Sequence, residues 1–128
     1  MNVNDFNAEI ALDLRGLIDA QYVIDLEIEP RHHNFMGFVH GGVLCTLLDT
    51  AMARSFFYAL PAEKRTGVTL EMKVNFLKAV RVGRITAYGK LVNSTKQTGY
   101  VEGYVEDEEG QLLAKASATI MLFEDRNS

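Results

Sequence analysis

The chain has 128 residues, of which 48% are hydrophobic, and its formal net charge is −4. This length fits about one domain, and the acidic balance argues against a general nucleic-acid binder, which usually has a basic face. No apolar run is long enough for a membrane span, and the N-terminus lacks the early positive charge of a secretion signal. The single cysteine, Cys45, excludes an intrachain disulfide framework and fits a reducing compartment, so we expect one domain over 1–128 in the cytoplasm.

The first third of the chain predicts a short helix and a strand. Residues 3–15 have a weak helical pattern. From Gln21 to Glu29 apolar and acidic residues alternate, which is typical of a half-buried strand. Pro30 ends this strand, because proline cannot donate to a sheet ladder, and a loop follows to Val39. The apolar face of the strand consists of Tyr22, Ile24, Leu26 and Ile28.

The segment from Gly41 to Leu60 predicts one long apolar helix. Asp49 and Arg54 are its only charged residues. A helix with so little charge around its circumference should be enclosed rather than lie on a surface. Helical spacing places on one broad face Leu44, Leu47, Leu48, Ala51, Met52 and Ser55.

The remainder predicts four antiparallel strands. In the first, over 68–76, Val68, Leu70, Met72, Val74 and Phe76 alternate with polar residues; the others span 84–92, 100–105 and 112–122. Turn signals at 82–83, 96–99 and 108–110 separate them. Only a sheet curling around the helix could bury it, so the sequence predicts an α+β fold. The last strand would face the helix with Leu112, Ala114, Ala116, Ala118, Ile120 and Leu122.

Asp49 is out of place in the predicted helix. Aspartate is a mediocre helix former, and an ionised carboxylate is costly to bury without a partner. No cation lies one helical turn away, where the residues are Cys45, Thr46, Met52 and Ala53, so a local ion pair does not explain it. Two interpretations stay open: a carboxylate satisfied by a distant lysine, backbone donors or solvent, or one kept free for chemistry.

The stretch His40-Gly41-Gly42 opens this helix. Two glycines there expose backbone N–H groups at the positive end of the macrodipole, where a ligand can approach closely, although the same pair also suits a tight turn. We expect His40 to hold the loop by hydrogen bonding. Asn34 would either close a turn on its own backbone or donate to a substrate carbonyl or a water molecule.

The remaining histidines and the cysteine look structural. His32 and His33 are expected to be exposed loop residues, and Cys45 a small core residue. Three scattered histidines with no carboxylate at ligand spacing predict no metal site.

The pattern Asn34-x5-His40-Gly41-Gly42-x6-Asp49 resembles the hotdog-fold acyl-CoA thioesterases. It looks most like the phenylacetate-degradation-type group of the 4-hydroxybenzoyl-CoA thioesterase superfamily. The likeness covers about 20–123 and includes "NFMGFVHGGVLCTLLDTA" and "GVTLEMKVNFLKAV". It implies a hotdog fold, in which a curved antiparallel sheet wraps around one central helix, and thioester hydrolysis without a metal or other cofactor.

The resemblance also implies roles for single residues. Asp49 would be the nucleophile or general base, the Gly41 N–H would polarise the thioester carbonyl, and Asn34 would orient water or thioester. Thr69 corresponds to the small hydroxyl residue beside the acid, where the family has serine. Because family sites lie at a dimer interface, Asn34, His40 and Gly41 of one subunit would face Asp49 and Thr69 of the other. The family commonly forms dimers of dimers.

Coenzyme A brings phosphates, and the sequence has no glycine-rich phosphate loop to receive them. Gly42 lies where a ligand could approach the start of the helix. Phe35, Met36 and Phe56, with Phe57 and Tyr58, could line a pocket for an aromatic or medium-chain acyl group, or belong to the core. The sequence does not identify that acyl group. The cations expected to meet the phosphates, unless they are only solvated surface charges, are Lys78, Arg81, Arg84 and Lys90.

Two other functions stay open. A hotdog hydratase or dehydratase of acyl thioesters would need a histidine paired with an acid, and that spacing is not evident around His40. A non-catalytic protein could bind acyl-CoA in the same cleft. We expect a homo-oligomer, because open strand edges and an exposed outer face of the sheet invite pairing of copies. We expect no nucleic-acid or membrane partner, given the acidic net charge and the absence of a long apolar run. That face would carry Tyr88, Val92, Tyr100 and Tyr104.

Overall fold

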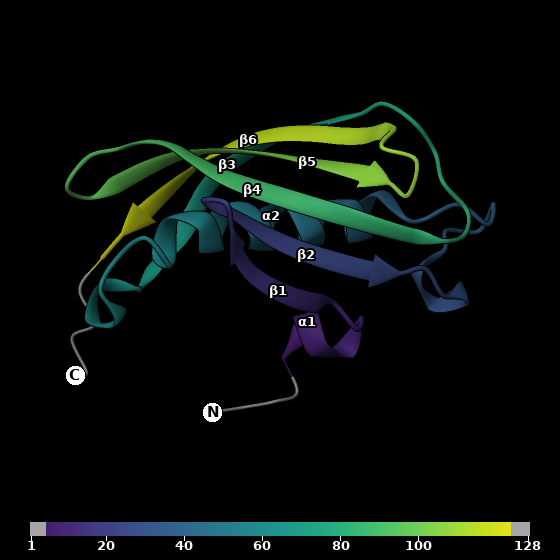
Figure 1. Ribbon diagram of the computed structural model, residues 1–128, viewed down its shortest axis with the longest axis horizontal. Helices are drawn as coiled ribbons and strands as arrows, with labels where there is room; N and C mark the ends of the chain where they lie inside the picture. Colours follow the sequence, from purple (N-terminus) through teal and green to yellow (C-terminus); the bar gives the residue numbers. More distant parts are fainter. Residues whose placement is uncertain (1–4, 124–128) are drawn as a thin grey trace.

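The computed structural model describes residues 5–123 and contains one antiparallel sheet and one long helix. The sheet order is β1-β2-β4-β5-β6-β3, and the sheet curves over α2 (Figure 1). This arrangement confirms the predicted α+β hotdog architecture. The elements are α1 (Phe6–Glu9), β1 (Asp13–Ile18), β2 (Gln21–Glu27), α2 (Gly41–Phe57), β3 (Gly67–Phe76), β4 (Arg84–Ser94), β5 (Thr98–Asp107) and β6 (Leu112–Leu122), with short 3-10 helices η1 (Pro30–His32) and η2 (Ala62–Lys64).

Helix α2 lies directly on the backbone of the sheet. A Cβ atom added to Gly89 would lie 2.2 Å from the carbonyl oxygen of Ala51, and one added to Gly99 would lie 2.6 Å from the Phe56 ring. The absence of these side chains lets the helix approach the strands closely. The buried residues of α2 are the six that helical spacing predicts, together with Phe56: Leu44, Leu47, Leu48, Ala51, Met52, Ser55 and Phe56.

The far end and the opposite face of α2 differ from the prediction. The helix ends at Phe57 rather than Leu60. Nε of Arg65 donates to the carbonyl oxygens of Phe57 and Leu60, at 3.0 and 3.1 Å, and so caps the last turn. Residues 5–123 also do not enclose the helix, because the sheet covers only one of its sides. The open face is half-buried and carries Cys45, Thr46, Asp49, Thr50, Ala53 and Arg54.

The N-terminal prediction is largely wrong. Within the described part of 3–15, only Phe6–Glu9 form a helix, and Asp13–Ile18 form the edge strand β1; residues 3 and 4 lie outside the described residues. Five of the six residues of β1 are exposed, and its pairing with β2 shifts between Leu14 and Gly16. An exposed strand with such an irregularity shows no clean alternation of apolar residues.

Strand β2 is buried on both faces rather than on one. Val23 and Asp25, expected on or beside the polar face, are only 7% and 5% exposed. The Asp25 carboxylate accepts hydrogen bonds from Arg15 at 2.6 Å, Arg84 at 2.7 Å and Thr86 at 2.7 Å. Burial raises the pKa of Asp25, but these hydrogen bonds outweigh burial and hold the pKa below its ordinary value.

The alternation predicted for β3 breaks at Leu70. In the pairing with β6, Thr69 lies opposite Ile120 and Met72 opposite Ala118, and the register shifts between them. Ile120 and Ala118 are buried on the helix side of the sheet. Leu70 is therefore the extra residue of a bulge and is exposed. The bulge turns Thr69 toward α2, whereas simple alternation places it on the outer face.

The last three strands agree with the prediction in number but are partly longer. β4 extends to Ser94 and β5 starts at Thr98, so the turn predicted at 96–99 lies at 95–97, where the hydroxyls of Thr95 and Thr98 are 2.6 Å apart. Leu112 is 41% exposed and does not join the inner face of β6. No helix within residues 5–123 is both long and apolar enough to cross a membrane.

Candidate active site

Asp49 lies half-buried on the open face of α2. The Thr69 hydroxyl donates a hydrogen bond to its Oδ1 at 2.7 Å. No ion pair to Asp49 forms among residues 5–123, so the interpretation of a distant lysine finds no support in this part of the chain. Thr69 orients the carboxylate and leaves Oδ2 available to another partner.

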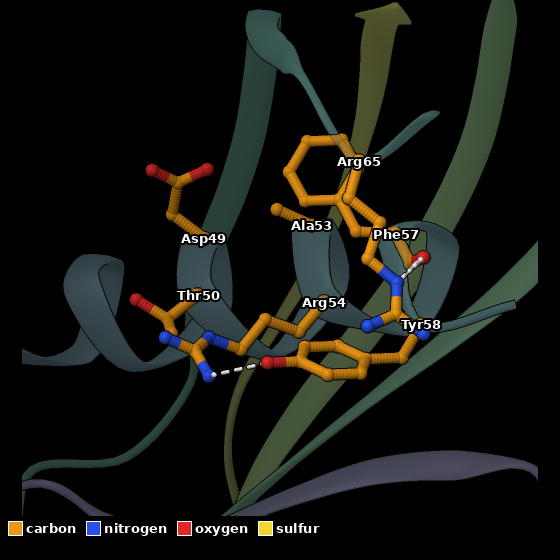
Figure 2. Close-up of a pocket in the computed structure, with 7 residues that line it drawn as sticks. All are labelled: Asp49, Thr50, Ala53, Arg54, Phe57, Tyr58 and Arg65. Atoms are coloured by element: carbon orange, nitrogen blue, oxygen red, sulfur yellow. Dashed lines mark hydrogen bonds between the residues drawn. The ribbon is translucent and has the colours of Figure 1, made fainter. Parts of the chain in front are cut away.

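A cavity of about 340 Å³ opens beside Asp49 (Figure 2). Most of its lining comes from the open face of α2, at a spacing that helical periodicity could have grouped. Arg65 follows η2, and nothing in the sequence marks it as a neighbour of Asp49. Apart from Asp49, Phe57 and Tyr58, the lining residues were not candidates from sequence. The lining consists of Asp49, Thr50, Ala53, Arg54, Phe57, Tyr58 and Arg65.

The start of α2 forms a second group. Nδ1 of His40 accepts a hydrogen bond from the Gly42 N–H at 2.8 Å, so His40 caps the helix and holds the loop as expected. A Cβ on Gly42 would lie 2.9 Å from this nitrogen, which glycine avoids. The Gly41 N–H makes no hydrogen bond within the described residues, as the first N–H of a helix has no internal partner.

Asn34 closes a turn on its own loop. Its Oδ1 accepts from the N–H groups of Met36 at 2.9 Å and Phe38 at 3.1 Å, which is the structural role that the sequence left open. Its amide NH₂ remains available among the described contacts. Asn34 and Gly41 share a second cavity of about 420 Å³ with Met36, Phe38, Val39, Leu44, Phe76, Leu77, Lys78 and Ala79.

The chain thus brings the predicted catalytic residues together in two separate groups. Asp49 pairs with Thr69, and Asn34 lies with His40 and Gly41. Gly41 and Asp49 are eight residues apart on α2, or about 12 Å along its axis, and they line different cavities. One chain alone does not assemble them into a single site.

The predicted acyl-pocket residues separate as well. Phe56 is 1% exposed and packs on the sheet at Gly99, so its expected contact with substrate is wrong: it belongs to the core. Phe35 is 96% exposed at the tip of its loop. Met36 lines the second cavity and Phe57 the first.

The four predicted phosphate contacts have different surroundings. Lys78 lines the second cavity and hydrogen bonds to Gln111. Arg81 lies 3.9 Å from the centroid of the Phe38 ring and donates to the Met36 carbonyl at 3.0 Å. Arg84 does not act as a free cation, because its guanidinium pairs with Asp25 on the outer face of the sheet.

Lys90 does not lie at either cavity, although the sequence predicted that it contacts the phosphates of coenzyme A. It is exposed, and it alternates along β4 with the buried residues that face α2. It therefore points away from both cavities.

His32 and Cys45 also depart from expectation. His32 is 1% exposed; its Nδ1 accepts the Glu29 N–H at 2.9 Å, and its Nε2 lies 2.7 Å from the Ile10 carbonyl oxygen. Cys45 is only half-buried, and burial together with the charge of Asp49 raises the pKa of its thiol. Within residues 5–123 no three His, Cys, Asp or Glu side chains gather as metal ligands do.

Comparisons of the sequence with known proteins identify a family. The sequence profile of the thioesterase superfamily matches residues 36–114. A candidate esterase from Saccharolobus solfataricus is 32% identical over 92 residues, which are 72% of this chain and 60% of that protein. The 1,4-dihydroxy-2-naphthoyl-CoA hydrolase of Listeria monocytogenes is 27% identical over 118 residues, 91% of this chain and 94% of that protein.

Solved structures share the fold. A mutant of the phenylacetic acid degradation protein PaaI from Thermus thermophilus superposes with a TM-score of 0.81 at 25% identity, covering 92% of this chain and 98% of that one. A thioesterase from Haemophilus influenzae gives a TM-score of 0.90 at 20% identity, covering 98% of this chain and 88% of that one.

Proposed function

The chain belongs to the thioesterase superfamily, and from that premise we propose that it hydrolyses acyl-CoA thioesters to a free acid and coenzyme A. The observation that carries this proposal is Asp49. Its carboxylate lies on an apolar helix beside a cavity, with a hydroxyl donor and no ion pair among residues 5–123. Such a carboxylate is suited to act as a base or nucleophile. The acyl group we propose is aromatic or of medium chain length, and the Listeria relative supports the aromatic class.

The start of α2 would supply the electrophilic half of the reaction. The Gly41 N–H has no partner among the described residues and lies at the positive end of the helix macrodipole. There it would donate to the thioester oxygen as negative charge develops on it. The amide of Asn34, in the same cavity, would orient the thioester or the attacking water.

Asp49 would act on the polarised carbonyl by one of two routes. As a nucleophile, its oxygen attacks the carbonyl carbon and the thiolate of coenzyme A leaves; water then hydrolyses the mixed anhydride. As a general base, it takes a proton from water, whose oxygen attacks instead. An acylated protein seen by mass spectrometry after rapid acid quenching would indicate the first route.

The complete site would need two chains. Within residues 5–123, strand β3 pairs only with β6 and leaves its other edge open. On this strand Val68 and Leu70 are 48% and 55% exposed. An open edge with apolar residues invites pairing with another strand. We propose that β3 pairs with β3 of a second copy, so that Gly41 of each subunit faces Asp49 of the other. The stacked Tyr88 and Tyr104 on the outer face would remain for a dimer of dimers.

The test removes the two parts of the proposed site separately: the Asp49 carboxylate and the Gly41 N–H. Asp49→Asn keeps the shape of the side chain but loses the charge, and should lower kcat by about 10²-fold or more. Gly41→Pro deletes the single N–H, and proline is well tolerated at the first helical position, where His40 already has the extended conformation that precedes proline (φ −62°, ψ 136°). Gly41→Ala keeps the N–H and is the matched control.

Turnover is measured as free thiol released from a panel of aryl, short, medium and long acyl-CoA substrates, with circular dichroism as the check on folding. Undiminished hydrolysis by Asp49→Asn would refute the assignment. Hydration of an enoyl thioester without free thiol would instead favour the hydratase. Nδ1 of His40 is occupied by the Gly42 N–H, and no specific observation favours that alternative.

A further inference from the structure

Two arginines line the cavity beside Asp49, and the proposed hydrolysis gives them no role. In Figure 2, the Arg54 guanidinium lies beneath Thr50, next to the Tyr58 hydroxyl, and the Arg65 guanidinium lies on the other side of Ala53, near the opposite end of the Tyr58 side chain. Neither Arg54 nor Arg65 forms an ion pair within residues 5–123. Two cations sharing a cavity without a carboxylate partner in that part of the chain are suited to receive an anion.

Arg54 is held in place by two tyrosines. Its Nη1 donates to the hydroxyl of Tyr22 at 3.1 Å and to that of Tyr58 at 3.5 Å. Its Cζ lies 5.6 and 5.8 Å from the centroids of the same two rings. Nε and Nη2 make no hydrogen bond among the described residues, so the guanidinium is positioned while part of its donor fork stays unused.

Arg65 is positioned from the other side. Its Nε donates to the carbonyl oxygen of Phe57, the last residue of α2, and to that of Leu60 in the following turn. Its Cζ lies 4.4 Å from the centroid of the Tyr58 ring. Its two terminal nitrogens have no partner within residues 5–123. Both guanidiniums therefore lie against the Tyr58 side chain, Arg54 at its hydroxyl and Arg65 at its ring, and each keeps N–H donors available to an anion.

The position of the pair indicates which anion it would take. Arg54 follows Asp49 by five residues on α2, about 7.5 Å along the helix axis. A charge that close to the reacting carbonyl belongs to the acyl group, because the phosphates of coenzyme A lie beyond the whole pantetheine arm. A volume of about 340 Å³ is also near the lower end for small-molecule sites, which suits an acyl group better than a nucleotide.

We propose that Arg54 and Arg65 form an anion-binding subsite that selects acyl groups carrying a carboxylate at their far end. The inference rests on the proposed function, since it places the thioester at Asp49. Phe57 and Ala53, which line the same cavity, would contact the apolar middle of the acyl chain. The two guanidiniums would bind the terminal carboxylate by charge-assisted hydrogen bonds.

The experiment compares adipoyl-CoA, whose acyl group ends in a carboxylate, with its methyl ester. The ester has the same acyl chain but no charge at the far end. The wild-type protein should prefer adipoyl-CoA by about tenfold or more in kcat/KM, because hydrogen bonds between charged groups are the strong ones. Arg54→Met and Arg65→Met should each remove most of this preference by slowing adipoyl-CoA, with the ester little changed. Arg54→Lys, which keeps the charge, should restore part of it. Lys64→Met removes a neighbouring exposed cation that lines none of the cavities described above and is the matched control.

Calorimetric binding of both compounds to Asp49→Asn protein separates this proposal from the hydrolysis itself. If that protein binds adipoyl-CoA more tightly than the ester, the subsite stands even if neither compound is turned over. If the ester is hydrolysed as fast as adipoyl-CoA, thioesterase activity stands and the subsite is refuted. If both arginine variants weaken binding of free coenzyme A and raise KM for both substrates equally, the pair binds phosphate and the carboxylate assignment is overturned.

Discussion

At the scale of single residues, the sequence could show that Asp49 lacks a cation one turn away but not which group it contacts. Thr69 donates to it from β3 at 2.7 Å, although simple alternation directs Thr69 away from the helix. The bulge at Leu70 reverses that direction, and one extra residue in a strand leaves no clear sequence signal. Only the resemblance to known thioesterases paired the two residues in advance.

The Thr69 contact predicts a graded effect on turnover. Thr69→Val keeps the side-chain shape but removes the donor, so Asp49 loses its orientation and kcat should fall about tenfold with little change in KM. Thr69→Ser keeps a hydroxyl and should stay within about twofold of wild type. Steady-state kinetics of thiol release measures both. Equal kcat values for the valine variant and the wild type would show that the hydrogen bond does not serve catalysis.

At the scale of elements, strong periodicity predicted best. The buried face of α2 and the strands after it follow from helical spacing and alternation. Strand β1 was missed because its stability comes from tertiary contacts and not from a pattern of apolar residues. Its Arg15 pairs with Asp25 of β2, and Asp25 in turn accepts from Arg84 and Thr86 of β4. Such a polar contact between three strands leaves no local signature.

The hydrogen bonds to Asp25 predict that the stability of the fold depends on pH. Because hydrogen bonds lower the folded pKa of Asp25 despite burial, the charged carboxylate stabilises the fold above its unfolded pKa, near 3.9. That contribution is lost as pH falls through the lower folded value. Asp25→Asn should therefore lower Tm by about 5 °C near pH 7, and the difference from wild type should shrink below about pH 4.

Thermal unfolding across pH 3–7 measures this difference. Glu27→Gln is the control, because it neutralises an exposed carboxylate of the same strand that forms no ion pair within residues 5–123. If the difference in Tm between Asp25→Asn and the wild type stays constant down to pH 3, the charge of Asp25 does not stabilise the fold.

At the scale of the whole molecule, the two groups of candidate residues predict complementation between chains. Asp49→Asn and Gly41→Pro each damage a different half of the proposed site. In a mixed dimer, both defects fall in one of the two sites and the other site is intact. Refolding an equal mixture of the two inactive variants should therefore restore about a quarter of wild-type activity, since about half of the dimers are mixed.

Free thiol release after co-refolding measures the recovery, and each variant refolded alone is the control. Recovery no greater than the sum of the two controls would show that one chain assembles its own site. The sequence could suggest this division only through the resemblance, because spacing along α2 does not say which copy completes a cavity.

The bare backbone beneath α2 restricts how this protein can evolve. A methyl group on Gly89 would collide with the helix backbone at Ala51, so a substitution there lifts the helix and moves Asp49 away from Thr69 without touching either residue. The opposite face of α2 lies under no such constraint. New substrate preferences should therefore arise by changes around Ala53 and Arg54, where a side chain can be exchanged without altering how α2 packs on the sheet.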